Sequence, residues 1–278
     1  MNTDAQVVVG YDGTPDSLAA LAWAARMASL RGATVVATTI IDPRETPRGV
    51  AWPESWWEET EDKARKEVAP WPGLDARFER HVGHLVPALV EAAQGGSMLV
   101  VGSKGHGLVG EILLGSVSQS TARHAALPVV VVRPAHNPEA DRIVVGADGS
   151  ESSARAIEFA CETARLTGQK VVALRAWYPA TVVTDRYGYL PMSTGNSAEE
   201  VEAALRQKVE EVRTAHPDVT VEGEVYSGAA ERALVEASSN ASLVVVGSRG
   251  RSAVAGALMG SVSRDVLHQA HCPVAVVH

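Results

Sequence analysis

The sequence predicts a protein of the α/β class, organised as two similar domains that each stack βαβ units on a parallel sheet. The chain has 278 residues, which at about 150 residues per domain is enough for two hydrophobic cores. Short β-branched runs bounded by Gly, Asp and Pro alternate with longer segments of helical period, which is typical of βαβ units. The second half of the chain also repeats motifs of the first, so we expect both halves to fold alike.

The internal repeat sets the predicted domain boundaries. The matching segments are VVVGYDGT and VVGADGS, LVVGSKG and VVVGSRG, LGSVS and MGSVS, and PVVVV and PVAVV, in the same order in both halves. We therefore predict a first domain at residues 1–133 and a second domain at residues 142–278. The linker between them, residues 134–141, contains Pro134 and Pro138, which stiffen it.

Each half is expected to contain five strands. They are predicted near residues 7–10, 34–40, 74–81, 98–101 and 129–132, and near residues 143–146, 171–176, 219–225, 243–246 and 274–277. The first helix follows the first strand, with Thr14 as N-cap, Pro15 as first helical residue and Gly32 as its end. Its equivalent in the second half runs from Ser150 to Gly168.

Charge and cysteine content exclude several classes of protein. With 25 Lys and Arg against 33 Asp and Glu, the formal net charge is -8, which disfavours broad binding to nucleic acid. Cys161 and Cys272 lie far apart, so no disulfide framework is expected and a reducing cytoplasm fits best. No apolar run approaches the roughly 18 residues that a membrane-spanning helix needs, so we expect no membrane insertion.

The most informative motif is a glycine-rich loop that follows the fourth predicted strand of each half. It reads Gly102-x2-Gly105-x9-Gly115-Ser116 in the first half and Gly247-x2-Gly250-x9-Gly260-Ser261 in the second. One copy is weak evidence, but two copies at matching repeat positions are strong evidence. Glycine permits positive φ and lets a ligand approach backbone amides, and the start of a helix attracts anions. The motif therefore predicts an anion-binding cradle.

Polar side chains around the loop strengthen that prediction. The hydroxyls of Ser116, Ser118, Ser261 and Ser263 are expected to add hydrogen-bond donors, and Lys104 and Arg249 place positive charge on the loop. The loop is neither a P-loop nor a dinucleotide-binding GxGxxG loop, because neither pattern occurs at the required place. The alternative is that the glycines serve only tight turns and the serines only cap helices.

With these motifs, the sequence resembles tandem universal stress proteins of the nucleotide-binding subgroup that carries Gly-x2-Gly-x9-Gly-Ser/Thr. The resemblance covers nearly the whole chain. It implies two Rossmann-like domains of the adenine nucleotide alpha hydrolase-like type, each with a five-stranded parallel sheet in the order 3-2-1-4-5 between helices. In such a sheet the first and fourth strands are neighbours, and ligands bind beyond their carboxyl ends. This explains how Asp12 and the Gly102 loop can share one site.

The resemblance also implies the residues that contact ATP. They fall on Asp12, Ile40, Val101, Gly102, Gly105, Gly115, Ser116, Val117 and Ser118, and on Asp148, Ala176, Val246, Gly247, Gly250, Gly260, Ser261, Val262 and Ser263. Ile40 and Ala176 are the expected apolar walls for the base. Family members often have Pro two residues before the aspartate, where this chain has Gly10 and Gly146, and this departure is expected to loosen the adenine pocket.

Asp12 and Asp148 are the acidic residues of the two predicted sites. A carboxylate at the end of a strand accepts hydrogen bonds from ribose or adenine, or helps to hold Mg²⁺, although an Asp-Gly turn is the alternative. No water-activating base with a convincing partner is evident, so efficient hydrolysis is not implied. The expected function is an ATP-binding regulator of the stress response. A slow ATPase and a nucleotide-independent chaperone-like or scaffold module are the alternatives.

Three further features bear on partners. Trp52, Trp56, Trp57 and Trp71 cluster between the second and third predicted strands, where they form a lid, a partner surface or a local core. The second half carries a different insert at residues 177–196, so access to the two sites is expected to differ. The last strand of each half is very apolar for a sheet edge. As in the resembled family, we expect these two strands to pair within the chain; a homodimer is a further expectation.

Overall fold

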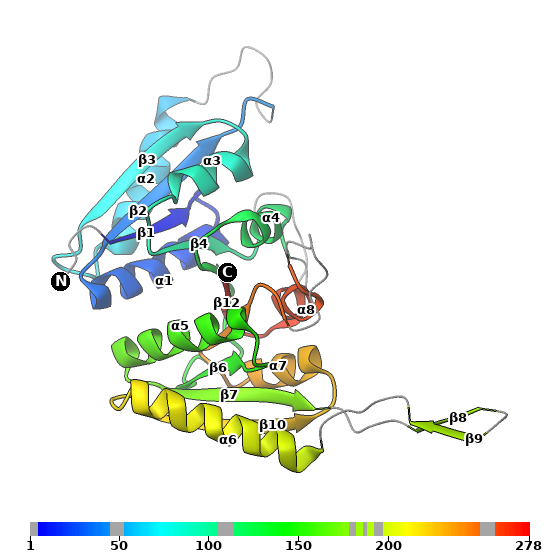
Figure 1. Cartoon of the computed structure of the whole chain (residues 1–278). Coiled ribbons are helices and arrows are strands. Elements are labelled where there is room, and N and C mark those ends of the chain that lie inside the picture. The colour runs from blue at the N-terminus through cyan, green and yellow to red at the C-terminus, as the bar shows by residue number, and fades with distance from the viewer. Residues whose placement is uncertain are drawn as a thin grey trace.

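A computed structural model describes residues 5–44, 53–104, 114–177, 182–185, 188–191, 197–250 and 259–278. Of the ATP-contacting residues that the sequence predicts, Gly105 lies outside these ranges, as does Trp52 of the tryptophan cluster. The fold is α/β, with one ten-stranded sheet that runs through both halves of the chain (Figure 1).

The ten strands of this sheet are the ten that the sequence predicts, with ends shifted by one or two residues. They are β1 (Gln6–Gly10), β2 (Thr34–Ile41), β3 (Ala76–Val82), β4 (Met98–Gly102), β5 (Val129–Val132), β6 (Arg142–Gly146), β7 (Lys170–Trp177), β10 (Val221–Ser227), β11 (Leu243–Gly247) and β12 (Val274–Val277). Their order is β10-β7-β6-β11-β12-β5-β4-β1-β2-β3. Within each half the order by sequence is therefore 3-2-1-4-5, which makes the first and fourth strands neighbours.

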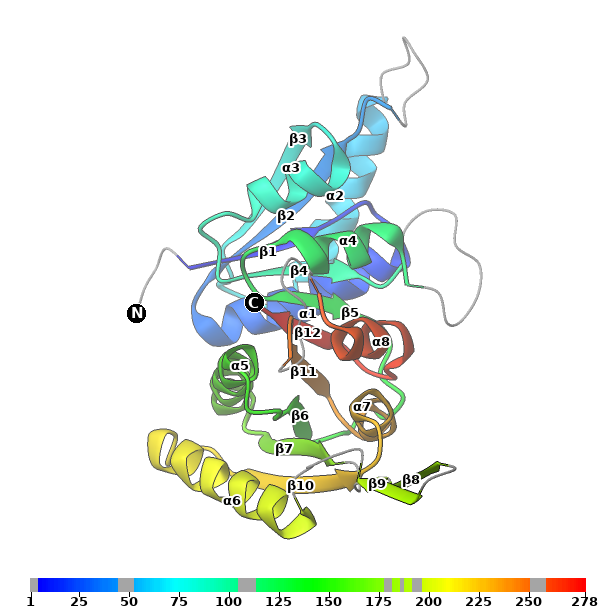
Figure 2. The ribbon, with the colours of Figure 1, turned by 45° about the vertical axis from the view of Figure 1, so that its right-hand side comes forward.

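The helices cover both faces of the sheet (Figure 2). They are α1 (Pro15–Arg31), α2 (Glu54–Val68), α3 (Leu85–Ala92), α4 (Ser116–His124), α5 (Glu151–Thr167), α6 (Ala198–Ala215), α7 (Ala230–Ser238) and α8 (Ser261–Gln269). Residues of α1, α2, α5 and α6 belong to one buried apolar cluster, and residues of α3, α4, α7 and α8 belong to the other. Because both faces are covered, the central strands are buried from end to end and read as runs of valine.

The predicted ends of the first helix in each half are confirmed. Thr14 Oγ1 accepts a hydrogen bond from Ser17 N at 3.3 Å, and Gly32 ends α1 in the left-handed conformation with φ of 64°. In α5, Ser150 caps the start and Gly168 ends the helix with φ of 72°. These local signals place the starts of α1 and α5 directly after β1 and β6.

The two halves join through their last strands. β5 and β12 pair antiparallel, with Val130 opposite Ala275, whereas the other pairs in this sheet are parallel. Arg133, just after β5, donates hydrogen bonds to the carbonyl oxygens of Leu267 and Ala270 at the end of α8. Each apolar edge strand is thereby covered by the other half.

The insert of the second half contains a structure that the sequence did not predict. β8 (Val182–Asp185) and β9 (Gly188–Pro191) pair antiparallel with each other as a separate two-stranded sheet. Cys161 is buried in α5 as predicted, and burial raises the pKa of its thiol to about 11. In the part of the chain that the structure describes, no helix combines the length and the apolar character that crossing a membrane requires.

Candidate functional sites

Each half contains one cavity at the carboxyl edge of the sheet, where the first and fourth strands lie side by side. Cavity 1, in the first half, has a volume of about 540 Å³, and cavity 2, in the second half, has a volume of about 450 Å³. Both lie within the usual range of ligand pockets. Their position is the topological switch point of a doubly wound sheet, which is where such folds bind ligands.

The residues that the sequence assigns to the two sites gather around these cavities. Cavity 1 is lined by Asp12, Ile40, Val101, Gly102, Gly115, Ser116, Val117 and Ser118. Cavity 2 is lined by Asp148, Ala176, Val246, Gly247, Gly250, Gly260, Ser261, Val262 and Ser263. All the described candidates therefore surround a cavity, although they come from distant parts of the sequence. Their contact with ATP remains a prediction.

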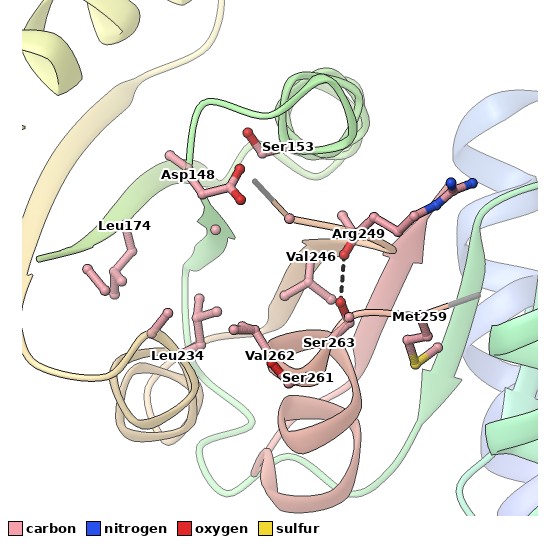
Figure 3. Close-up of a pocket in the computed structure, with 17 residues that line it drawn as sticks. Asp148, Ser153, Leu174, Leu234, Val246, Arg249, Met259, Ser261, Val262 and Ser263 are labelled. Atoms are coloured by element: carbon pink, nitrogen blue, oxygen red, sulfur yellow. Dashed lines mark hydrogen bonds between the residues drawn. The ribbon is translucent and has the colours of Figure 1, made fainter. Parts of the chain in front are cut away.

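Asp12 and Asp148 both form the Asp-Gly turn that was the alternative interpretation. Asp12 Oδ1 accepts hydrogen bonds from Thr14 N at 3.0 Å and from Thr14 Oγ1 at 2.5 Å. Asp148 Oδ1 likewise accepts from Ser150 N at 2.8 Å, and the glycine after each aspartate has positive φ. Since a Cβ added to Gly250 would lie 2.9 Å from Asp148 Oδ2, the second oxygen faces the glycine loop (Figure 3). In both halves the turn fixes one oxygen, and in the second half the other oxygen is directed toward the glycine loop.

The prediction that the loop glycines turn the chain with positive φ is wrong for those that the structure describes. None of Gly102, Gly115, Gly247, Gly250 and Gly260 has a positive φ. The first glycine of each motif is required for a different reason, because α1 and α5 pass too close for a side chain. A Cβ on Gly102 would lie 2.7 Å from the backbone carbonyl group of Asp16, and one on Gly247 would lie 2.8 Å from the backbone of Ser152.

The third glycine of each motif leaves a helix start uncovered. Gly115 is the N-cap of α4 and Gly260 is the N-cap of α8, and neither helix has a side-chain cap. The first backbone N–H groups of a helix have no acceptor within it, so those of α4 and α8 are directed to the cavity edge. A Cβ on Gly260 would meet its nearest atom at 3.6 Å, which is ordinary contact. Packing does not explain this glycine, whereas access of a ligand to the amides does.

The two inner serines do not act as the sequence analysis expects. Ser118 Oγ donates its proton to Gly102 O at 2.6 Å, and Ser263 Oγ donates to Gly247 O at 2.7 Å. Both side chains are buried. Since a hydroxyl has one proton to donate, these two serines fasten the helix start to the strand end and leave no hydroxyl donor for a ligand in this arrangement.

The outer serines fit the prediction better. Ser116 and Ser261 are the first residues of α4 and α8, and both are exposed at the cavity edge. Of the two basic loop residues, Lys104 lines cavity 1 and Arg249 lines cavity 2. Figure 3 shows the guanidinium of Arg249 directed away from the cavity and its backbone nearer to it. Its positive charge therefore lies on the side of the loop that faces away from the cavity.

Several residues that line the cavities were not among those predicted from the sequence. Leu85 and Leu89 of α3 line cavity 1, and Leu234 of α7 lines cavity 2. Their helical period marks them as apolar, but period alone does not separate a cavity wall from a core. The space beside Gly10 is already filled, because a Cβ there would lie 2.9 Å from Leu89 Cδ2. Gly10 therefore accommodates Leu89.

One tryptophan of the cluster is buried in local packing. Trp57 of α2 is 7% exposed, its ring meets Trp56 edge to face at 4.5 Å between centroids, and Arg80 lies over it at 4.9 Å. None of Trp56, Trp57 and Trp71 lines cavity 1. For Trp56 and Trp57 the structure therefore supports local packing, and none of the three described tryptophans forms a wall of cavity 1.

Comparison with known proteins agrees with the fold and with the repeat. Residues 5–133 and residues 139–278 each match the model of the universal stress protein family. This chain belongs to the universal stress protein family. Universal stress protein Rv2005c of Mycobacterium tuberculosis is 36% identical over 292 residues, which cover 97% of this chain and 96% of that protein. Universal stress protein Rv1996 of the same species is 35% identical over 302 residues, which cover 99% and 95%.

A solved structure supports the family fold over the full length. The crystal structure of a universal stress protein from Archaeoglobus fulgidus superposes with a TM-score of 0.71 and covers 100% of this chain and 99% of its own. The two sequences are 20% identical, so the likeness concerns the fold. The tandem arrangement of two universal stress protein domains is thus shared by relatives in sequence and by a relative in structure.

Proposed function

We propose that each half of this universal stress protein binds an adenine nucleotide, ATP with Mg²⁺, and that occupancy regulates partners in the stress response. The observation that carries the proposal is the uncapped start of α4 and of α8, each placed at a cavity that also receives an aspartate and apolar walls. A helix start with accessible amides favours phosphate. The apolar walls favour a planar base.

The lining residues divide into parts that suit the parts of a nucleotide. In cavity 1 the base would lie against Ile40, Leu89 and Val101, and in cavity 2 the equivalent walls are Ala176, Leu234 and Val246. The phosphates would lie at the exposed Ser116 and Ser261, over the first amides of the two helices. The aspartate, fixed in its turn, would accept hydrogen bonds from the ribose hydroxyls.

Mg²⁺ fits this arrangement as a companion of the phosphates. Among the described residues no group of three or more His, Cys, Asp or Glu side chains could hold a metal ion. Mg²⁺ in nucleotide sites is commonly held by one or two carboxylates together with phosphate oxygens and water. As an alternative to the ribose contact, Asp12 and Asp148 are the carboxylates that would serve, and Mg²⁺ would neutralise phosphate charge. The proposal assigns no catalytic residue.

We further propose that the protein is cytoplasmic and that it forms a homodimer. Cys161 and Cys272 are free and buried, which suits a reducing cytoplasm. Since β5 and β12 pair within the chain, a homodimer would have to use another surface. Sedimentation of the purified protein measures that assembly.

The test is a calorimetric titration of the purified protein with Mg²⁺-ATP. The protein is first denatured in a parallel sample and the released nucleotide is assayed, so that sites already filled are counted. We expect two sites per chain. Gly115→Val and Gly260→Val, which place a side chain between the loop and the helix start, should each remove one site, while the exposed Lys63→Ala of α2 should remove none. A folded protein with no bound and no bindable adenine nucleotide would falsify the proposal.

A further inference from the structure

The two cavities differ at the position where the first helix of each half meets the glycine loop. This position lies four residues after the site aspartate and is Asp16 in the first half and Ser152 in the second. Both residues lie in the first turn of their helix, in α1 and α5. The sequence repeat therefore places a carboxylate in one half where the other has a neutral hydroxyl.

Close packing holds this position against the loop in both halves. The backbone of Asp16 lies so near Gly102 that a Cβ on the glycine would stand 2.7 Å away, and the backbone of Ser152 stands 2.8 Å from the same point of Gly247. The side chain at this position therefore has to contact the start of the glycine loop. Its chemistry acts on the loop directly in each half.

The contacts are opposite in character. Asp16 Oδ2 accepts hydrogen bonds from Ser103 Oγ at 2.8 Å and from the backbone N of Lys104 at 2.9 Å. Ser152 Oγ instead donates a hydrogen bond to the carbonyl oxygen of Arg249. In the first half the backbone N–H of Lys104 is thus hydrogen-bonded to a carboxylate. Lys104 itself lines cavity 1.

Arg133 offsets part of the charge of Asp16 in the first half, and the second half has no equivalent cation at that position. Arg133 acts on Asp16 from the end of β5, but its guanidinium donates to carbonyl oxygens at the end of α8. The corresponding position at the end of β12 is His278, whose pKa burial lowers, so it is neutral near pH 7. Asp12 and Asp148 occupy equivalent places, as do Lys104 and Arg249. Neither Asp16 nor Ser152 lines its cavity, so each acts on a ligand through the loop to which it is hydrogen-bonded.

We propose that Asp16 and Ser152 make the two sites unequal toward ligand charge. This inference rests on the proposed nucleotide binding. Cavity 2 takes nucleoside triphosphates more tightly, and cavity 1 favours adenine nucleotides with fewer phosphates. The cause is that the Asp16 carboxylate occupies the backbone N–H of Lys104 and adds negative charge behind the loop that would receive the phosphates, whereas Ser152 does neither. Asp16 and Ser152 are specificity-determining residues that act on the phosphate end and leave the base end unchanged.

The experiment measures each site alone. The Gly260→Val protein retains cavity 1 and the Gly115→Val protein retains cavity 2, and each is titrated with adenosine, AMP, ADP and ATP at one ionic strength, with and without Mg²⁺. The gain in affinity from AMP to ATP should be larger in cavity 2. In the cavity 1 protein, Asp16→Ser should raise ATP affinity about tenfold and leave adenosine affinity unchanged. In the cavity 2 protein, Ser152→Asp should lower ATP affinity about tenfold, with adenosine again unchanged.

A conservative variant separates charge from hydrogen bonding. Asp16→Asn keeps the shape and one oxygen acceptor but removes the charge, so it should reproduce most of the gain of Asp16→Ser. Equal phosphate dependence in the two cavities, or equal changes for adenosine and ATP in the variants, would overturn the inference. A lower ATP affinity for Asp16→Ser in Mg²⁺ would overturn it in favour of a metal ligand. If neither protein binds any adenine ligand, the proposed function fails as well.

Discussion

The two halves of this chain share their backbone contacts and differ in the side chains around their cavities. In both halves a hydroxyl caps the first helix, a glycine admits that helix to the loop, and a buried serine donates to the end of the fourth strand. Three positions of the walls are not shared. Tyr11, Thr38 and Ile40 line cavity 1 at the places where Ala147, Leu174 and Ala176 line cavity 2.

One of these differences changes the space behind the site. The Tyr11 side chain is buried and donates its hydroxyl proton to Thr60 O of α2 at 3.0 Å. The pocket beside it in the first half measures about 20 Å³. With Ala147 in the second half, a pocket of about 290 Å³ lies between α5, α6 and β7. Duplicated backbone contacts thus preserve the site in both halves, while unshared side chains change the polarity of its wall and the packing beside it.

The largest expected effect tests the division between the first and third glycines. Gly102→Ala should destabilise the protein by about 2–3 kcal/mol, because its Cβ would stand 2.7 Å from the α1 backbone. Gly260→Ala is the matched control and should change the free energy of unfolding by less than about 0.5 kcal/mol, because it has room and ordinary φ. Urea unfolding monitored by circular dichroism measures both. Equal free energies of unfolding for the two variants would show that the first and third glycines do not differ in packing.

The two cavities also differ at Thr38 and Leu174, which are equivalent positions in their walls. Thr38 is 1% exposed, and its Oγ1 has no hydrogen-bond partner among the described residues. Thr38→Val should stabilise the protein by about 1 kcal/mol, because it removes an unsatisfied buried hydroxyl. Leu174→Thr should destabilise it by about 2–3 kcal/mol, since it loses apolar burial and creates such a hydroxyl.

Thermal unfolding of the wild type, the two single variants and the double variant at positions 38 and 174 compares these two changes. Opposite signs at the two positions would confirm that one hydroxyl distinguishes the cavities. If Thr38→Val lowers the melting temperature, the hydroxyl has a partner in solution, and the contrast at the base ends is lost.

A smaller effect is expected at Tyr11, because the equivalent residue of the second half is Ala147, which has no phenol. Tyr11→Phe should cost about 1 kcal/mol by removing the hydrogen bond to Thr60 O. Burial, with smaller contributions from Asp12 and Glu67, raises the pKa of Tyr11 to about 12. The unfolded chain deprotonates first, so wild-type stability should fall as the pH rises from about 10 to about 12.

Tyr11→Phe should lack this part of the alkaline loss. Urea unfolding at several pH values between 8 and 12, written as the difference between wild type and variant, isolates the contribution of the phenol. A difference that stays constant with pH would show that Tyr11 does not keep its proton on folding.

The smallest expected effect concerns Asp42, which fixes the start of α3 in the first half only. Its carboxylate accepts hydrogen bonds from Arg44 Nη2 at 2.6 Å and from Leu85 N at 3.1 Å, and these contacts, with that of Arg44 the largest, hold the pKa of Asp42 well below its usual range. Its contribution is therefore present above about pH 4 and lost as the pH falls below that value.

Asp42→Asn should lower stability at pH 7, and its difference from wild type should shrink as the solution is acidified below about pH 4. Melting temperatures measured from pH 7 to pH 3 follow this change. The equivalent position in the sequence is Tyr178, which carries no carboxyl and lies outside the described residues. A difference that persists unchanged at pH 3 would show that the shape of the Asp42 side chain, and not its charge, stabilises the protein.

Much of the fold could be predicted because its signals are local. The ten strands of the main sheet, the caps Thr14 and Ser150 and the terminal glycines Gly32 and Gly168 all follow from residues that are neighbours in the chain. The β8–β9 hairpin escaped prediction because its turn signal stands inside an insert without a repeat counterpart. The candidate residues of the two sites were found through the doubled glycine motif and a family resemblance.

The sequence by itself determined the repeat, the strands, the helix ends and the residues that could form a site, since chain-local hydrogen bonding and side-chain period specify them. Only the tertiary structure decided what those residues do. It assigned Gly102 to helix packing, directed the Ser118 hydroxyl to a carbonyl and brought Asp16 to the loop amide. These roles depend on distances between segments far apart in the chain, and packing of the whole sheet and its two helix layers fixes those distances.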